Sequence, residues 1–271
     1  MTSVNIASLT DLPTLPLILR SLFEVLQDEK STFVDIANVI KHDQSLTEKI
    51  LRVANSPYFG HTGKVNTLEQ AIMFLGYDLV KGICLGTSVF RFLGRNERER
   101  LGKLWQHSYE VGIIAANISD HVCNIERGIC FVSGLLHDIG RVIFITLHKE
   151  KYLLMLSSDK IFLKEKEVFG IDHPAAGGNF LENARLPEEI VCSVRYHHKP
   201  SMCTRYRETS SVISLAEALS RSFFPKIEDD GIWTEEHDAI LLELSLDEGK
   251  IKKVREKAVE ETAAMQELFT V

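Results

Sequence analysis

Apolar residues recur along most of the chain at the spacing of an α-helix. Between residues 15 and 26 they fall three or four positions apart, for example at Leu15, Ile18 and Leu22, and residues 32–42 repeat the pattern. This spacing places the side chains on one face of a helix. Alternating apolar and polar positions, which would indicate strands, are scarce. The pattern therefore predicts an all-α fold without a sheet.

Three short motifs have the spacing of a capping box, in which Ser or Thr is followed three residues later by Glu or Gln. They are Ser45-Leu-Thr-Glu48, Thr67-Leu-Glu-Gln70 and Ser245-Leu-Asp-Glu248. Each predicts that a helix begins just after its first residue. The third would open the last helix, in which apolar residues from Val254 to Phe269 share one face.

Three polar segments interrupt the helical pattern and are expected to be loops. Residues 55–63 are rich in Gly, Pro, Ser and Asn, residues 94–100 are mostly charged, and residues 224–231 combine Pro with acidic residues. We interpret the charged run as a boundary. It divides the chain into an N-terminal helical subdomain, residues 1–94, and a second helical subdomain, residues 95–271.

The composition is that of a globular protein with a sizeable core. The chain has 271 residues, of which 45% are hydrophobic and 25% are charged, unlike disordered chains. Its net charge is -7, whereas sequence-independent nucleic-acid binding needs a basic face that neutralises phosphates. We therefore expect no nucleic-acid partner.

Neither a membrane nor an oxidising compartment is expected. The longest apolar runs are broken by charges or Gly, as in Ile72–Gly86, so none is long enough to cross a bilayer. The start, Met1-Thr-Ser-Val-Asn5, lacks the basic residues of a secretory signal. The five cysteines are odd in number and form no Cys-x-x-Cys pair, so they are predicted to be buried and reduced. A soluble cytoplasmic protein is the expectation.

The candidate chemistry lies in the second half of the chain. The first 94 residues hold only His42 and His61 of the ten histidines, so eight lie beyond them. His137 and Asp138 directly follow the apolar run Phe131–Leu136. A buried carboxylate needs a hydrogen-bond partner, a positive charge or a metal, because burial of an unpaired charge costs several kcal/mol.

Several helices could bring these side chains together around one or two divalent ions. Imidazole and carboxylate ligands suit Fe, Mn or Zn, and paired ions in hydrolases lie about 3.5–4 Å apart. Glu217 is a lone carboxylate in an otherwise apolar segment, Ile213–Leu219, and joins the candidates. His121 and His148 are expected at the surface instead. The predicted ligands are His107, His137, Asp138, His173, His197, His198 and Glu217.

The same residues also have an ordinary structural explanation. A histidine on an apolar helix is more often a satisfied core residue than a ligand, so His107, His137 and Asp138 could form a buried hydrogen-bonded cluster. Arg141 lies one helical turn after Asp138. It could bind a substrate phosphate, or it could serve as the counter-ion of Asp138.

A set of longer motifs is more specific than the histidine spacing. The motifs are Asp11-Leu-Pro-Thr-Leu-Pro16, Ile50-Leu-Arg-Val-Ala-Asn-Ser-Pro-Tyr-Phe-Gly60, Leu68-Glu-Gln-Ala-Ile-Met-Phe-Leu-Gly76, Leu104-Trp-Gln-His-Ser108, Gly134-Leu-Leu-His-Asp-Ile-Gly-Arg141, Asp172-His173, Leu186-Pro-Glu-Glu-Ile190 and Tyr196-His-His198. In these motifs the chain resembles the HDOD domain proteins, bacterial relatives of the HD superfamily of metal-dependent phosphohydrolases.

The resemblance implies an N-terminal helical subdomain packed on a subdomain shaped like an HD phosphohydrolase. It also implies two groups of metal ligands, namely His107, His137, Asp138 and Glu217 for one ion, and His173, His197 and His198 for the second ion of two-metal members. Glu217 takes the place of an aspartate of the superfamily. Arg141 replaces the lysine of the cyclic-di-nucleotide phosphodiesterases, whose Gly-Tyr-Pro signature is also missing after His198. Hydrolysis of cyclic di-GMP is therefore not expected.

Beside the hydrogen-bonded cluster, the resemblance leaves two functions open. The first is a regulatory module of bacterial signal transduction with little or no turnover. It would sense a nucleotide, a phosphate or a metal and act on protein partners in trans, since no receiver or output domain accompanies the motifs. The alternative is a metal-dependent phosphatase or nucleotide phosphodiesterase. There Asp138 would bridge the ions and Arg141 would stabilise charge on the phosphoryl oxygens.

Overall fold

The regular structure of the protein is helical. The computed structural model describes residues 30–56, 64–93, 98–155, 161–223 and 232–265, together with isolated positions from 18 to 28. Within these ranges no strand is present. The prediction of an all-α fold is therefore confirmed for the described part of the chain.

The described residues form a succession of helices. In chain order they are α2 (Phe33–Ile40), α3 (Gln44–Ala54), α4 (Leu68–Leu75), α5 (Tyr77–Leu93), α6 (Arg98–Ser119), α7 (Arg127–Leu136), α8 (Ile139–Met155), α9 (Ile161–Phe169), α10 (His173–Asn183), α11 (Glu188–Tyr196), the 3-10 turn η3 (Pro200–Met202), α12 (Arg207–Phe223), α13 (Glu235–Glu243) and α14 (Glu248–Met265).

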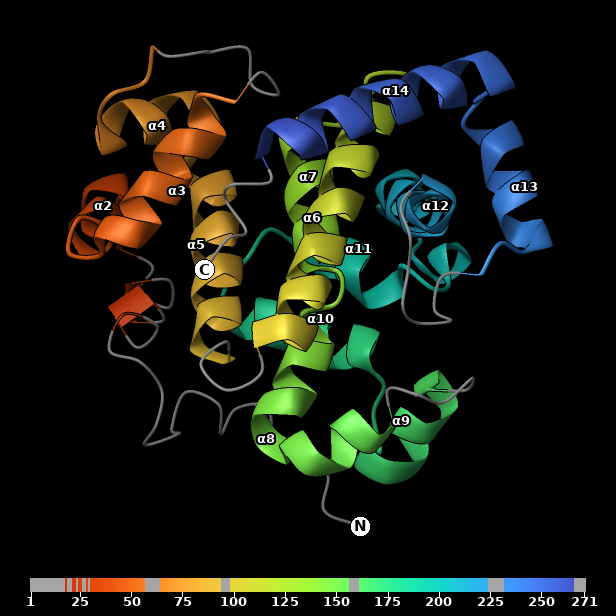
Figure 1. Ribbon diagram of the computed structural model, residues 1–271, viewed down its shortest axis with the longest axis horizontal. Coiled ribbons are helices and arrows are strands. Elements are labelled where there is room, and N and C mark those ends of the chain that lie inside the picture. Colours follow the sequence, from red (N-terminus) through yellow and green to blue (C-terminus); the bar gives the residue numbers. More distant parts are fainter. Residues whose placement is uncertain are drawn as a thin grey trace.

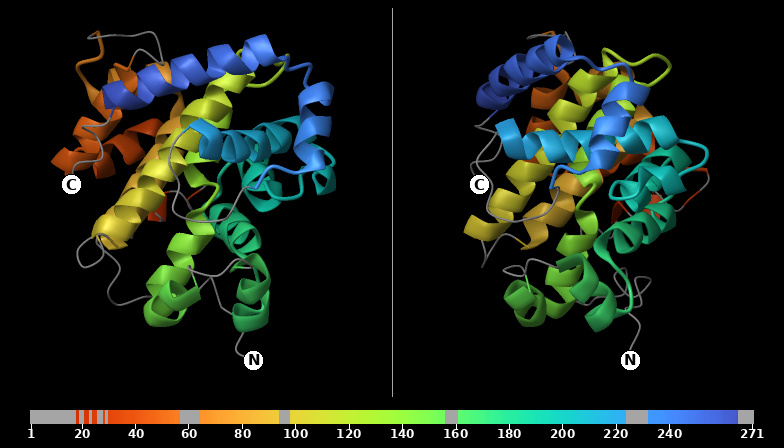
Figure 2. Two further views of the ribbon diagram at one scale, coloured as in Figure 1. Left: turned by 45° about the vertical axis from the view of Figure 1, so that its right-hand side comes forward. Right: turned by 90° about the vertical axis from the view of Figure 1, so that its right-hand side faces the viewer.

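The long helix α6 runs through the middle of the molecule (Figure 1). It packs against α7, α12 and α14. Helices α2 to α5 lie on one side of it, and α12 and α13 lie on the other (Figure 1). Helices α8 and α9 lie at the end opposite α14 in every view (Figure 2). Of the other helices that carry predicted ligands, α11 packs on α7, α12 packs on α6 and α7, and α10 packs on α8 and α11.

One hydrophobic core connects the helices of both predicted subdomains. Its buried members include Ile36 in α2 and Ala258 in α14. Helices α6 and α7 approach closely at Gly112 and Gly134, where a Cβ added to Gly134 would lie 2.7 Å from Cα of Gly112. The division into two subdomains stays a prediction, because its boundary falls on residues that the structure does not describe.

One of the three predicted capping boxes is confirmed. Oγ1 of Thr67 accepts a hydrogen bond from the backbone N–H of Gln70 at 3.2 Å, and Oε1 of Gln70 accepts one from the backbone N–H of Thr67 at 3.3 Å. Helix α4 begins at the next residue, Leu68. The two reciprocal bonds satisfy backbone donors that the first turn of a helix leaves free.

The other two predicted capping boxes are wrong, because an aspartate two residues away takes the place of the serine. Asp43, rather than Ser45, accepts from the third backbone N–H of α3 at 3.0 Å. Asp247, rather than Ser245, accepts from the third backbone N–H of α14 at 2.8 Å. Ser245 adopts a φ of +53° in the preceding turn. Asp and Ser cap helices about equally well, so the spacing alone did not distinguish them.

Some sequence features lie outside the described residues. They are the motif at 11–16, most of the helix expected at 15–26, residues 57–63 of the first loop with His61, residues 94–97, residues 224–231, and Phe269.

The cysteines are all free thiols, but they are not all buried. Cys84, Cys130 and Cys203 are buried as predicted, and Cys192 is partly buried. Cys123 is exposed in the turn between α6 and α7. The prediction of uniformly buried cysteines is therefore wrong for Cys123.

One helical stretch of the described chain, Arg127–Met155, is long and apolar enough to cross a membrane by length and composition, contrary to the sequence-based expectation. An 18-residue part of this stretch has a mean hydropathy of 1.6, and 89% of it is buried inside the molecule. Leu68–Leu75 and Tyr77–Ser88 are long and apolar enough only when taken together, and the two helices are bent by 113° relative to one another. Core helices of soluble proteins can be equally long and apolar, and extensive burial is typical of them.

Candidate metal centre

All side chains predicted as ligands meet in one region, although they are far apart in the sequence. Helix α6 supplies one, the junction between α7 and α8 supplies two, the start of α10 supplies one, the end of α11 supplies two, and α12 supplies one. In that order they are His107, His137, Asp138, His173, His197, His198 and Glu217.

His107, His137 and Glu217 form a first group. Their candidate ligand atoms all lie within 4.8 Å of one another. The imidazole rings of His107 and His137 meet edge to face, with centroids 5.0 Å apart. They are brought together because α7, which ends just before His137, packs along α6.

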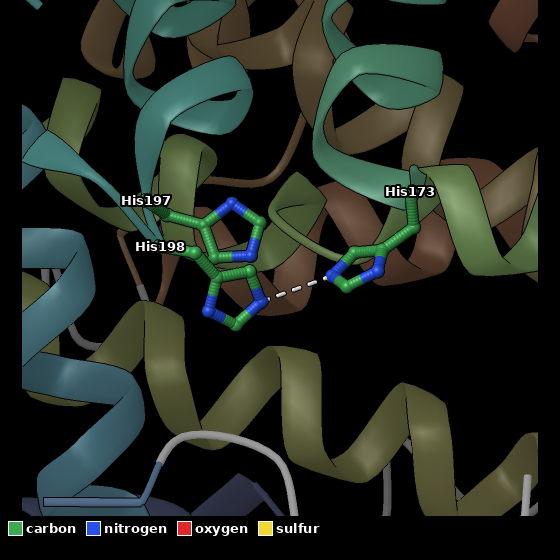
Figure 3. Close-up of side chains that lie close together, drawn as sticks. All are labelled: His173, His197 and His198. Carbon is green, nitrogen blue, oxygen red and sulfur yellow. Dashed lines mark hydrogen bonds between the residues drawn. The ribbon is translucent and has the colours of Figure 1, made fainter. Parts of the chain in front are cut away.

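His173, His197 and His198 form a second group, whose candidate ligand atoms also lie within 4.8 Å of one another. Figure 3 shows the imidazoles of His197 and His198, at the end of α11, facing the imidazole of His173 at the start of α10. The Nε2 atoms of His173 and His198 are 3.1 Å apart. Three imidazoles from two helix ends therefore surround one point.

Two carboxylates link the groups into one cluster. Oδ2 of Asp138 lies 3.5 Å from Nε2 of His137, and Oδ1 lies 3.3 Å from Nε2 of His173. Oε2 of Glu217 lies 3.9 Å from Nε2 of His197 and 3.8 Å from Nδ1 of His198. Each carboxylate thus reaches both groups of histidines, which is the arrangement that a bridging ligand needs.

A glycine allows Asp138 to lie beside His173. Gly140 opens α8 so close to the first turn of α10 that an added Cβ would lie 1.9 Å from the carbonyl oxygen of His173. No side chain fits in that space. The Asp138-Ile-Gly140 segment therefore positions the start of α8 directly against the start of α10.

Arg141 is an internal partner of Asp138. Its Nε donates to Oδ1 of Asp138 at 2.8 Å, and the side chain is 1% exposed. Burial by itself would raise the pKa of the Asp138 carboxyl, but Arg141 and the surrounding histidines hold that pKa well below its usual range. Of the two roles considered for Arg141, the structure displays the counter-ion. Contact with a substrate phosphate stays a prediction.

The tautomers of His137 and His197 direct a lone pair into the cluster. Each is the residue that ends a helix, and its Nδ1 lies 2.7 Å from a carbonyl oxygen one turn earlier, that of Gly134 or Val194. A carbonyl only accepts, so Nδ1 carries the proton and Nε2 keeps its lone pair. Both Nε2 atoms are buried, and neither has a hydrogen-bond partner among the described residues.

Burial keeps these imidazoles neutral. It lowers the pKa of His137, and it lowers the pKa of His197 and His198 well below the usual range, with neighbouring histidines adding to the effect at the latter two. A metal binds the neutral form of imidazole. The donor set, its tautomers and its protonation states therefore fit a divalent ion.

The structure adds two polar residues that the sequence did not single out. Oε2 of Glu165 accepts from the backbone N–H of His173 at 2.8 Å and from its Nδ1 at 2.7 Å, and Oε1 accepts from the hydroxyl of Tyr152 at 2.6 Å. Burial would raise the pKa of the Glu165 carboxyl, but His173 and its other partners lower it. The sequence could have indicated that Glu165 is buried, because it lies four residues from both Ile161 and Phe169. These three residues share one face of α9, and all three are buried.

The cluster is mostly closed to solvent. The side chains of His107 and His198 are 18% and 19% exposed, whereas those of His137, His173 and His197 are fully buried. The expectation for His148 is confirmed, since it is exposed, but His121 is partly buried.

Comparison with known proteins adds a family match. The model of the HDOD domain family matches residues 12–200 of the chain. A protein of Treponema pallidum described as uncharacterized is 23% identical over 221 residues, which are 78% of this chain and 42% of that protein. The chain thus spans less than half the length of this relative.

Solved structures share the fold. A proposed signal transduction protein from Marinobacter aquaeolei aligns with a TM-score of 0.71 and 19% identity, over 100% of this chain and 62% of that one. A proposed phosphohydrolase from Shewanella amazonensis aligns with a TM-score of 0.69 and 21% identity, over 99% of both chains. Identities at this level show that the helical fold is common to the three proteins.

Proposed function

The chain belongs to the HDOD domain family, and on this basis we propose that it is a metal-binding regulatory module of signal transduction with little or no catalytic turnover. In this proposal, binding or loss of metal at the cluster changes how the helices that carry the ligands pack on one another. The output is contact with a protein partner in trans.

The observation that carries the metal-binding part is the pair of buried lone pairs on His137 and His197. A purely structural histidine cluster would be expected to satisfy its inward nitrogens by hydrogen bonds, because a buried acceptor without a partner costs about 1–3 kcal/mol. Coordination to a cation would satisfy both. This favours a metal over the hydrogen-bonded cluster, although Arg141 does pair with Asp138 as that explanation expected.

The residues that would hold the metal are those of the two groups together with Asp138. Their nitrogen-rich composition suits Fe, Mn or Zn rather than Mg or Ca, which prefer oxygen ligands. When bound, such an ion supplies Lewis acidity and lowers the pKa of a coordinated water toward about 7. The chain's own contribution is to orient the imidazoles, to bury them, and to keep them neutral.

Low turnover is supported by the state of Arg141. A phosphoryl-transfer site needs a cation free to face the phosphate. Arg141 is buried, and its Nε is bonded to Asp138, the carboxylate that would have to bridge the ions. Binding of a substrate phosphate to Arg141 would require that this ion pair be broken.

A metal-dependent phosphohydrolase is the second candidate, and one observation favours it. Two histidine groups lie side by side and share Asp138 and Glu217, and paired ions in hydrolases need this kind of shared carboxylate. The related fold of the proposed phosphohydrolase from Shewanella amazonensis agrees with this reading.

The test combines metal content with turnover. Protein purified without chelators is analysed for Fe, Mn and Zn, and is then assayed on p-nitrophenyl phosphate and bis(p-nitrophenyl) phosphate with each metal in excess. We expect bound metal in the wild type, loss of metal in His137→Ala, no change in the exposed variant His148→Ala, and no turnover that depends on His137. Protein that cannot be loaded with any of these metals would end the proposal. Turnover that is lost in His137→Ala would establish the hydrolase instead.

A further inference from the structure

The contacts behind His173 differ from those behind the other buried histidines of the centre. His137 and His197 each donate Nδ1–H to a neutral backbone carbonyl at 2.7 Å. Nδ1 of His173 instead faces a carboxylate, with Oε2 of Glu165 at 2.7 Å. At the same distance, an ionised acceptor makes a stronger hydrogen bond than a neutral one. His173 therefore differs from His137 and His197 in having a carboxylate, rather than a backbone carbonyl, at its Nδ1.

These contacts form a closed circuit of buried polar residues. The hydroxyl of Tyr152 donates to Oε1 of Glu165 at 2.6 Å, and Nη1 of Arg141 lies 3.5 Å from the same hydroxyl. Nε of Arg141 donates to Oδ1 of Asp138 at 2.8 Å, and that oxygen lies 3.3 Å from Nε2 of His173. The circuit joins α8, α9 and the start of α10. Two of its members, Asp138 and His173, are predicted metal ligands.

Glu165 is fixed in position by three hydrogen bonds. It is fully buried, as is Tyr152. It accepts from the backbone N–H and Nδ1 of His173 and from the hydroxyl of Tyr152. Burial of a carboxylate is tolerated only when such bonds replace its hydration. Because two of the three donors belong to one residue, Glu165 holds both the backbone and the ring of His173.

We propose that Glu165 is a positioning residue of the metal centre, which fixes His173 in the tautomer and ring orientation that present the Nε2 lone pair to His197 and His198. Tyr152 holds Glu165 in place for this role. The inference rests on the proposed metal-binding function, and it identifies the residue that prepares one of the two ligand groups. Glu165 is not among the residues that would hold the metal; it acts through His173.

The effect on metal binding follows from this contact. A carboxylate behind an imidazole increases the basicity of the ligating nitrogen, and loss of such an outer partner typically lowers metal affinity by about 10- to 100-fold. In Glu165→Gln the side chain keeps its shape and its amide oxygen can still accept from His173, so the charge is removed; the amide NH2 then faces the hydroxyl of Tyr152, which becomes the acceptor of that bond. Tyr152→Phe keeps the ring, which packs near Phe144 and Phe169, and removes the bond that steadies Glu165.

The first experiment measures Zn²⁺ affinity of chelator-stripped protein by competition with a chromophoric chelator. Glu165→Gln should bind about 10- to 100-fold more weakly than the wild type, Tyr152→Phe should bind more weakly by a smaller factor, and Glu167→Gln should bind as the wild type does. Glu167 is the matched control, because it lies on the same helix and is exposed. Equal affinity of Glu165→Gln and the wild type, or an equal loss in Glu167→Gln, would overturn the inference.

The second experiment reads the tautomer of His173 without metal. Imidazole ¹⁵N chemical shifts of the full-length, metal-free protein should place the proton of His173 on Nδ1 in the wild type and in Glu167→Gln. In Glu165→Leu, or in Glu165→Ala if the first variant does not fold, the two tautomers should mix. An unchanged tautomer in a folded Glu165→Leu protein would refute the role of Glu165. Wild-type protein that binds no Zn²⁺ yet shows this tautomer shift would refute the proposed function and leave the positioning contact standing.

Discussion

Acidification of the metal-free protein from pH 7.5 to pH 5.5 should lower its free energy of unfolding by up to about 3 kcal/mol through His197 and His198. The pKa values of both lie well below the usual range, because His197 is buried, His198 is largely buried and neighbouring histidines disfavour the charged form. Burial also lowers the pKa of His137. In the unfolded chain these imidazoles regain a pKa of about 6.5.

The sign and the size follow from proton linkage. Between the unfolded and the folded pKa values the unfolded chain binds more protons, so stability falls as the pH decreases through about 6.5. The unfolded imidazole is half protonated at pH 6.5, so a histidine that stays neutral in the folded protein contributes about 1.4 kcal/mol over the whole interval from pH 7.5 to pH 5.5. His197 and His198 together therefore give up to about 3 kcal/mol over that interval, and His137 adds to it. The carboxyl groups of Asp138 and Glu165, whose pKa values are lowered, lose their contribution only at lower pH.

Urea unfolding followed by circular dichroism, in the presence of EDTA, measures this dependence. The matched variant is His197→Asn, because its amide can still donate to the carbonyl of Val194 but does not titrate. Between pH 7.5 and pH 5.5 it should lose less stability than the wild type, by up to about 1.4 kcal/mol. A wild-type stability that is flat from pH 7.5 to pH 5.5, or an unchanged slope in the variant, would refute the reasoning.

Three other outcomes test packing, capping and binding. Gly140→Ala should destabilise the protein by several kcal/mol, because its Cβ would meet a backbone carbonyl oxygen at 1.9 Å. The control Gly102→Ala, in open space on α6, should stabilise it by about 0.5–1 kcal/mol. Equal urea midpoints of the two variants would contradict the packing at Gly140. Asp43→Ala should cost about 1 kcal/mol and Ser45→Ala less than half as much, and the reverse order in urea unfolding would restore the serine cap. Zn²⁺ at about 100 times its Kd should stabilise the wild type by about 2.7 kcal/mol but not His137→Ala, and equal shifts in thermal unfolding would place the ion elsewhere.

The candidate histidines could be chosen because most lie beside apolar sequence, and their grouping could be expected from the resemblance to the HDOD domain proteins. His137 and Asp138 follow a buried stretch, and Glu217 stands alone among apolar residues of α12. Such positions face a core in a compact helical bundle, where a buried polar side chain needs a partner. Which nitrogen of each imidazole faces inward could not be predicted, because it depends on carbonyls at the ends of α7 and α11.

The residues behind His173, namely Glu165 and Tyr152, could not be predicted for a different reason. Glu165 lies between Lys164 and Lys166 in a charged segment, and Tyr152 follows a similar segment, so their composition indicates a solvated surface. Only the packing of α9 against the start of α10 buries Glu165. The choice of Arg141 between a substrate phosphate and Asp138 was likewise open in the sequence, since the spacing allows both, and the geometry of the first turn of α8 brings its guanidinium to Asp138 at 2.8 Å.

The most direct test of the account is anomalous diffraction from crystals grown without chelators and with Fe, Mn or Zn. The account predicts an anomalous peak within about 2.0–2.3 Å of Nε2 of His137 or of His197, in the space that Asp138 and Glu217 border. Ordinary solvent peaks at about 2.8 Å from these nitrogens, without anomalous signal, would contradict it.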